Sequence, residues 1–301
     1  MGYYEKVYSR VDYRVWLITV PLLALLLLPA ALNVKLGIDF TGGTEIQIVT
    51  ERTVSASQFE SAFEQCGATD MGANVQNIEG RTTAILKTRA EISKECADKA
   101  LSSIGFTQED LAKVIPTTFR PELGQTLIAQ GSRVFIMAGI LMMIVIFVAF
   151  RSIIPSIAVI QAAVFDVIIG LGALSLMGFE MSLAGFAALL MLIGYSVDTD
   201  IVLTSNVLKD RGKPLAEQVN RAFTTGITMT CTAIAAMTAV LIVSTFVQIE
   251  TIHQIALVLV AGLSADLMTT WLVNVAILDW YLKRTPVHSG KSRFNFRIFR
   301  S

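Results

Sequence analysis

The sequence predicts a multi-pass α-helical membrane protein with six transmembrane helices, arranged as one plus five around an extracytoplasmic α+β domain. Three observations predict this fold class: a strongly apolar composition, six long apolar runs, and a polar stretch at 34–132 that contains strand and helix patterns. Hydrophobic residues make up 53% of the 301 residues and charged residues 16%, with a mean hydropathy of +0.62. This composition excludes an ordinary soluble enzyme. The formal net charge is zero, so charge gives no reason to expect a nucleic-acid partner.

Each apolar run is long enough to cross about 30 Å of hydrocarbon as a helix. The runs cover 15–32, 134–150, 153–177, 181–208, 226–247 and 255–282. The first run could act as a cleaved signal peptide. Its Pro29-Ala30-Ala31 end is a poor cleavage site, so we expect an uncleaved anchor instead.

The positions of Lys and Arg in the short loops predict the orientation. Basic residues occur at Arg151, between 209 and 221, and from 283 onward, whereas the loops at 178–180 and 248–251 contain none. We therefore expect a cell-membrane protein with both termini in the cytoplasm. The expected parts are the N-terminus with helix 1 (1–33), the extracytoplasmic domain (34–132), helices 2 to 6 (133–283) and a basic cytoplasmic tail (284–301). The tail could contact anionic lipid or remain solvated.

The extracytoplasmic stretch has the pattern of a small α/β unit. Residue alternation predicts strands at 45–50, 73–79, 82–87 and 113–119, and helical spacing predicts helices at 55–66 and 93–104. The order β-α-β-β-α-β is the ferredoxin-like pattern. Such a domain could bind a substrate or partner, or act as a rigid spacer. Cys66 and Cys96 fall on the two helices, and whether they form a disulfide stays open, since that requires Cα atoms within about 7 Å.

Four aspartates lie well inside the apolar runs, namely Asp166, Asp198, Asp200 and Asp266. A charged carboxylate at the bilayer centre costs roughly 2.5–3.5 kcal/mol, so such groups normally face a bundle interior or a wet cavity. Burial disfavours the charged form, which makes these residues candidates for proton relay. For Asp166 and Asp266, each single in its span, a structural hydrogen bond is an equal alternative.

Asp198 and Asp200 lie two residues apart, which places them about 200° apart on a helix. Asp200 shares a face with Ser196 and Thr204, while Thr199 lies between the two aspartates. Two polar stripes on one span indicate a helix deep in a protein bundle. The pair therefore predicts transport chemistry. The alternative is a structural role, in which the carboxylates form hydrogen bonds to a neighbouring helix.

The stretch from Arg221 into the fifth run is rich in small and hydroxyl side chains, including Thr225 and Thr228. Small residues let helices approach closely, and threonines can bond across the contact. We expect this span to pack on the fourth. Arg221 could pair with an intramembrane aspartate or extend to the cytoplasmic edge.

Catalytic and ligand-binding motifs are missing from the sequence. There is no phosphate-binding loop, and His253 and His288 show no metal-ligand spacing. Paired membrane aspartates could serve an intramembrane protease, but the Gly-x-Gly-Asp partner motif of such enzymes is lacking. We expect no enzyme activity, no cofactor and no metal.

Several of these motifs together resemble the SecF family of protein-export membrane subunits, in its archaeal form. Asp39-Phe40-Thr41-Gly42-Gly43 looks like the motif that opens its outside domain. Residues 194–202 look like its fourth-span motif, and Arg221 with 224–228 resembles the start of its fifth span. The resemblance covers essentially the whole chain.

The resemblance implies a function that the residues alone do not. Such a chain pairs with SecD, assists the SecY channel in moving preproteins outward, and uses the proton gradient, as half of a resistance–nodulation–division-type unit. Many bacterial members have Asn-Asp-Ser where this chain has Asp198-Thr199-Asp200, so the family carboxylate aligns with Thr199. Which aspartate carries the proton therefore stays open. The alternatives are a small-molecule or lipid exporter of the same superfamily and a translocon scaffold without transport activity.

Overall fold

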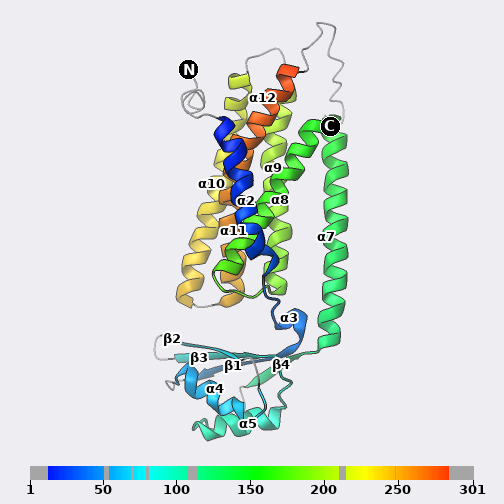
Figure 1. The fold of residues 1–301 in the computed structure, drawn as a ribbon. Coiled ribbons are helices and arrows are strands. Elements are labelled where there is room, and N and C mark those ends of the chain that lie inside the picture. Colours follow the sequence, from blue (N-terminus) through cyan, green and yellow to red (C-terminus); the bar gives the residue numbers. More distant parts are fainter. Residues whose placement is uncertain are drawn as a thin grey trace, which may run out of the picture.

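The computed structural model describes residues 13–284 except 51–53, 69–70, 79–80, 108–110, 112–113, 210–214 and 248. A bundle of long helices lies above a small α+β domain (Figure 1). Apart from Arg284, the expected basic tail lies outside the described residues, as does part of the expected turn between the second and third strands.

The helical bundle accounts for the six expected spans. Its helices are α2 (Tyr13–Leu32), α7 (Pro121–Phe150), α8 (Ile153–Leu176), α9 (Leu183–Lys209), α10 (Leu215–Val247), α11 (Glu250–Met268), η1 (Thr269–Asn274) and α12 (Val275–Arg284). Among the described residues, five helices are long and apolar enough to cross a membrane, with α11, η1 and α12 forming one span. The apolar part of α2 is shorter, Leu17–Leu32, and α2 packs against α8.

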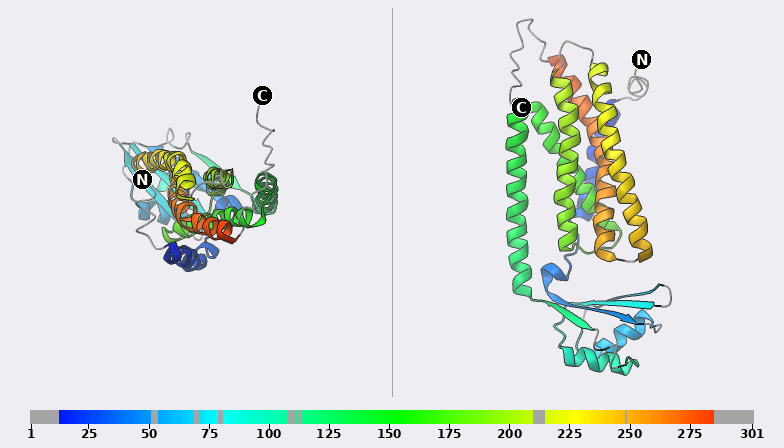
Figure 2. Two further views of the ribbon diagram at one scale, coloured as in Figure 1. Left: turned by 90° about the horizontal axis from the view of Figure 1, so that it is seen from above. Right: turned by 180° about the vertical axis from the view of Figure 1, so that it is seen from behind.

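Helix α7 lies at the side of the bundle (Figures 1 and 2). Large apolar side chains such as Ile140 and Phe147 are about half exposed along it. A helix with so much apolar surface outside its own bundle needs lipid or another protein around it.

The small domain is a four-stranded antiparallel sheet with helices on one face. Its elements are α3 (Ile38–Thr41), β1 (Gly43–Thr50), α4 (Ala56–Glu64), β2 (Gly72–Ile78), β3 (Arg81–Thr88), α5 (Lys94–Ser103) and β4 (Ile115–Phe119). The strand order β2-β3-β1-β4 confirms the ferredoxin-like prediction. We call residues 43–119 the sheet domain.

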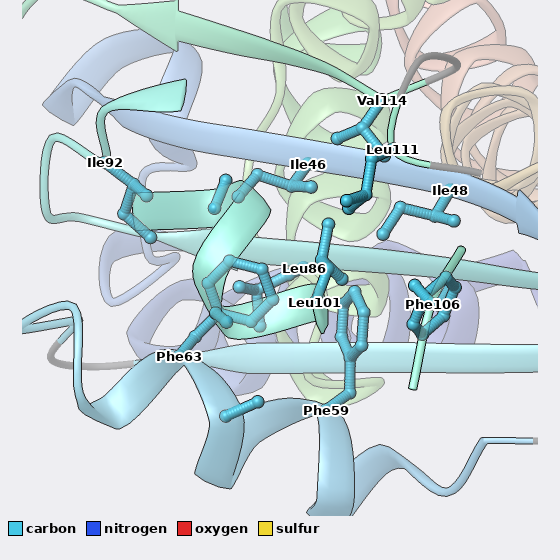
Figure 3. Close-up of a cluster of buried hydrophobic side chains, with 14 of the residues drawn as sticks. Ile46, Ile48, Phe59, Phe63, Leu86, Ile92, Leu101, Phe106, Leu111 and Val114 are labelled. Atoms are coloured by element: carbon cyan, nitrogen blue, oxygen red, sulfur yellow. The ribbon is translucent and has the colours of Figure 1, made fainter. Parts of the chain in front are cut away.

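Alternation along the strands explains why one sheet face is apolar. Ile46 pairs with Leu86 across β1 and β3, and both side chains are fully buried. They pack on Phe59 and Phe63 from α4 (Figure 3). Ser55 caps α4 with a reciprocal capping box, as a serine at that position favours.

The two helices of the sheet domain are joined by a disulfide. Cys66 and Cys96 are bonded with their Cα atoms 6.0 Å apart, which answers the question that their spacing left open. The disulfide links the end of α4 to the start of α5.

Backbone contacts also join the bundle to the segment that leads into the small domain. Leu36 forms a bridge with Met181. Gly37 N donates to Met181 O at 2.9 Å, and Met181 N donates to Lys35 O at 2.7 Å. The segment before α3 is thereby tied to the loop between α8 and α9.

Two helices begin much earlier than the apolar runs predict. Helix α7 begins at Pro121 rather than 134, and α10 begins at Leu215 rather than 226. Their first turns are polar and give no hydropathy signal, although Pro121 is a favoured first helical residue. A further difference is the π-helical segment η1 within the last span, which apolar patterning does not reveal.

Candidate functional site

Three of the four intramembrane aspartates meet inside the bundle. Asp166 comes from α8, Asp200 from α9 and Asp266 from α11, and none of the three is exposed at all. The sequence contains no Lys or Arg at 153–208 or at 222–282, which covers most of these helices. Helix packing thus gathers three carboxyl groups without a basic side chain from these stretches.

Asp166 accepts hydrogen bonds on both carboxyl oxygens. Ser196 Oγ donates to Oδ2 at 2.6 Å, and Thr269 Oγ1 donates to Oδ1 at 3.0 Å. These two donors come from α9 and η1, so Asp166 joins three helices. Each carboxyl oxygen of Asp166 therefore has a hydrogen-bond donor.

Asp200 and Asp266 share one hydroxyl group. Thr270 Oγ1 lies 2.9 Å from Asp200 Oδ1 and 2.9 Å from Asp266 Oδ1. Asn274 Nδ2 also donates to Asp200 Oδ1, at 2.7 Å. The remaining oxygens, Asp200 Oδ2 and Asp266 Oδ2, are buried without a hydrogen-bond partner among the described residues.

The π-helical segment η1 supplies three of the residues that contact these carboxyl groups. Thr269, Thr270 and Asn274 all belong to it and are all buried. π-helical turns are rare and are often found at functional sites. Sequence reasoning missed these residues. The signal available was a pair of threonines and an asparagine within an otherwise apolar span.

Asp198 lies apart from this network. It is exposed, whereas Asp200 is buried, as expected for residues on opposite sides of a helix. Asp198 lines a hollow of about 420 Å³ between α9 and α10, together with Tyr195 and Thr230. The hollow opens on the outer surface of the bundle.

The helix carrying Arg221 packs on α9, but Arg221 does not reach the level of the aspartates. Thr199 and Thr230 hydroxyls lie 3.3 Å apart, which aligns the two helices. Arg221 is exposed and precedes Thr230 by nine residues, or about 13.5 Å along a helix. The geometry therefore does not bring Arg221 to the buried network.

The expected supporting side chains divide between the inside and the outside of the bundle. Ser196, Thr199 and Thr204 are buried. Thr225 and Thr228 are exposed, and Thr228 donates to the backbone of its own helix at 2.7 Å. The Thr225 and Thr228 side chains therefore lie on the outer surface of the bundle.

The Asp39–Gly43 motif lies at the junction between the sheet domain and the bundle. Asp39 Oδ2 accepts from Leu183 N at 2.8 Å, at the start of α9, and Phe40 is buried in the bundle core. Gly42 has φ +81°. At Gly43 a Cβ would lie 2.2 Å from Thr88 O, so only glycine fits. The motif has a structural role in attaching the domain to the bundle.

Comparison with known proteins agrees with this architecture. Residues 99–284 match the family described as "Protein export membrane protein SecD/SecF, C-terminal", and residues 34–54 match the "SecD/SecF GG Motif". The second match contains the Asp39–Gly43 motif.

Two curated archaeal relatives carry the name protein-export membrane protein SecF. One, from Methanothermobacter thermautotrophicus, is 40% identical over 250 residues, covering 82% of this chain and 84% of the relative. The other, from Methanocaldococcus jannaschii, is 36% identical over 279 residues, covering 90% and 96%.

A solved structure shares the fold. The crystal structure of SecDF from Thermus thermophilus, a translocon-associated membrane protein, superposes with a TM-score of 0.67 at 23% identity. The similarity covers 89% of this chain but 38% of that one, so this chain corresponds to part of the larger protein. Its family matches, its relatives and its fold agree: the chain belongs to the SecD/SecF family of protein-export membrane proteins.

Proposed function

We propose that this chain is a SecF-type accessory subunit of the Sec export machinery that works beside a SecD-type partner and the SecY channel on translocating preproteins. Its relatives' names and its likeness to part of SecDF support this. In this proposal residues 34–132 lie outside the cell membrane and both termini lie in the cytoplasm. Arg151, Lys209 and Arg284 support that orientation, because they lie at helix ends remote from the sheet domain (Figure 1).

We further propose that the buried carboxyl groups couple the subunit to the proton gradient. The observation that carries this proposal is the shared Thr270 hydroxyl. A hydroxyl has one hydrogen and can donate to one carboxylate only. Its second contact at 2.9 Å is attractive only if that carboxyl group is protonated and donates to the Thr270 oxygen.

The hydrogen count assigns one proton to the Asp200–Asp266 pair, since Thr270 Oγ1 lies 2.9 Å from an oxygen of each carboxyl group. Asp200 Oδ1 also accepts from the Asn274 amide at 2.7 Å. Loss of the proton would place two facing carboxylates around one hydroxyl in a dry environment, which strongly favours a rearrangement of α11 against α9.

The energy available per proton is modest. Moving one charge through 100 mV releases about 2.3 kcal/mol. This amount can shift a conformational equilibrium by a few tens of fold, since each 1.4 kcal/mol is about tenfold. It is enough to reposition an outside domain but not to unfold a cargo.

The exposed carboxylate has a different role in this proposal. Asp198 and the hollow beside it face the SecD-type partner, because an exposed charge at this depth is costly in lipid. The buried and exposed aspartates can therefore be separated by experiment.

The test replaces Asp200 and Asp266 together, as Asp200→Asn/Asp266→Asn, and compares that variant with Asp198→Asn. Export of a reporter preprotein is measured with and without an ionophore in vesicles that contain the complete machinery. The buried double variant should lose the gradient-dependent part of export while still co-purifying with its partner. Asp198→Asn should weaken co-purification. Unchanged gradient dependence in the double variant refutes the coupling proposal.

A further inference from the structure

The sheet domain turns a polar face toward the helical bundle. Ile46 and Leu86 point to α4 and α5 (Figure 3), so their neighbours Glu45 and Lys87 point the other way, because side chains alternate along a strand. That other side is where the bundle lies (Figure 1). The face of the sheet that meets the bundle therefore carries charged side chains.

Lys87 reaches from the sheet to the bundle. Its Nζ lies 2.6 Å from Glu250 Oε2, and the two side chains are only 30% and 24% exposed. Glu250 is the first residue of α11, the helix that carries Asp266. A single ion pair thus connects β3 to the helix that contributes to the buried carboxyl network.

The Glu250 end of this pair is held in place by further hydrogen bonds. Gln254 Nε2 donates to Glu250 Oε1 at 3.2 Å, and Ser182 Oγ donates to Gln254 Oε1 at 2.5 Å. Ser182 immediately precedes α9. The acceptor for Lys87 is therefore fixed to the ends of two bundle helices.

A second carboxylate is available to Lys87 within its own sheet. Glu45 is the direct cross-strand partner of Lys87 in the β1–β3 pairing, and facing residues of opposite charge can form an ion pair. No ion pair joins them in the described part of the chain, where Lys87 is paired with Glu250. Burial raises the pKa of Glu45, the Lys87 charge lowers it, and the Glu250 charge raises it, so the three groups act on one another.

There is space at this contact for the lysine to move. A hollow of about 390 Å³ lies between the sheet domain and the bundle, with Lys87 and Glu250 among its lining residues. Water entering it would solvate both charges, which keeps such a pair weak and reversible. The backbone bridge at Leu36 and Met181 would keep the segment before α3 attached to the bundle while the ion pair opens.

We propose that Lys87 is a two-position clamp: paired with Glu250 it holds the sheet domain against the bundle, and paired with Glu45 it releases the domain. The structure shows the first position. Release breaks this ion pair and the longer, exposed Arg89–Glu180 contact, and the freed lysine finds a new partner on the facing strand. The clamp is independent of export and can be tested on the isolated full-length chain.

The experiment measures the position of the domain by pulsed electron paramagnetic resonance in nanodiscs. Spin labels are placed at Ser61→Cys on α4 and Phe246→Cys on α10, both exposed positions. The free Cys231 is replaced by alanine. The Cys66–Cys96 disulfide is kept.

Three variants give distinct outcomes. Glu250→Gln removes the holding partner and should increase the released fraction at least threefold. Glu45→Gln removes the alternative partner and should reduce that fraction to less than half of the original value. Glu180→Gln is the matched control, because its contact with Arg89 is long, at 3.9 Å, and exposed, and it should change nothing.

The outcomes that overturn the clamp are equally specific. A distance distribution in Glu250→Gln that matches the unsubstituted chain excludes Lys87–Glu250 as the holding contact. A shift in the same direction for Glu45→Gln and Glu250→Gln excludes partner exchange. A Glu180→Gln effect as large as that of Glu250→Gln would show a general charge effect instead.

Discussion

Removal of the Cys66–Cys96 disulfide tests how the sheet domain is stabilised. The bonded residues are 30 apart in sequence. In the chain-entropy treatment, closing a loop of that length removes about 12 cal/mol/K from the unfolded state, or about 3.6 kcal/mol at 25 °C. This is a large share of the stability of a small domain. The variant Cys66→Ala/Cys96→Ala should therefore open the domain several hundredfold more often, since each 1.4 kcal/mol is about tenfold.

The assay is hydrogen exchange of the full-length protein in nanodiscs, followed in peptides from β1 and β3 and, as an internal reference, from α8. Exchange in the strands should accelerate by two to three orders of magnitude, while exchange in α8 stays unchanged. Reduction of the disulfide in the unsubstituted chain should reproduce the effect. Strand exchange accelerated by less than about tenfold would refute the claim that loop closure provides this stability.

Three further perturbations probe the bundle and the charged contact. Thr270→Val keeps the shape of the side chain but removes the shared hydroxyl, and it should lower the stability of the bundle by about 1–3 kcal/mol. Thermal unfolding measures this change. Thr228→Val, at an exposed position, is the control and should have little effect. Gly226→Ala places a Cβ 2.4 Å from Trp271 Cζ2 and should lower the stability of the bundle by roughly 1–3 kcal/mol through overpacking. Gly194→Ala should be tolerated, because nothing lies within 4 Å of its Cβ. An equal loss of stability in both variants would contradict the packing. Burial raises the pKa of Glu45 above 4.5, so its contribution to stability is present below that pH and lost as pH rises through the folded-state pKa. Glu45→Gln should accordingly raise the melting temperature at pH 7 but not at pH 4, and a gain of equal size at both would contradict this.

Features that depend on neighbouring residues could be predicted from the amino-acid sequence. Six apolar runs predict the spans because each must cover the hydrocarbon with satisfied backbone groups. Alternation in 45–50 and 82–87 predicts two strands, and the structure confirms them as β1 and β3. The two-residue spacing of Asp198 and Asp200 places them on opposite sides of one helix, since each residue turns about 100°.

Which of these faces are buried, and which residues meet, depends on the packing of the folded chain. Asp166 and Thr269 are 103 residues apart and share a hydrogen bond, and Lys87 and Glu250 are 163 apart. The π-helical turn that brings Thr270 and Asn274 to Asp200 has no periodic signal. The reason is physical: periodicity records the local environment of a segment, whereas contacts between distant segments depend on how whole helices and the sheet pack against one another.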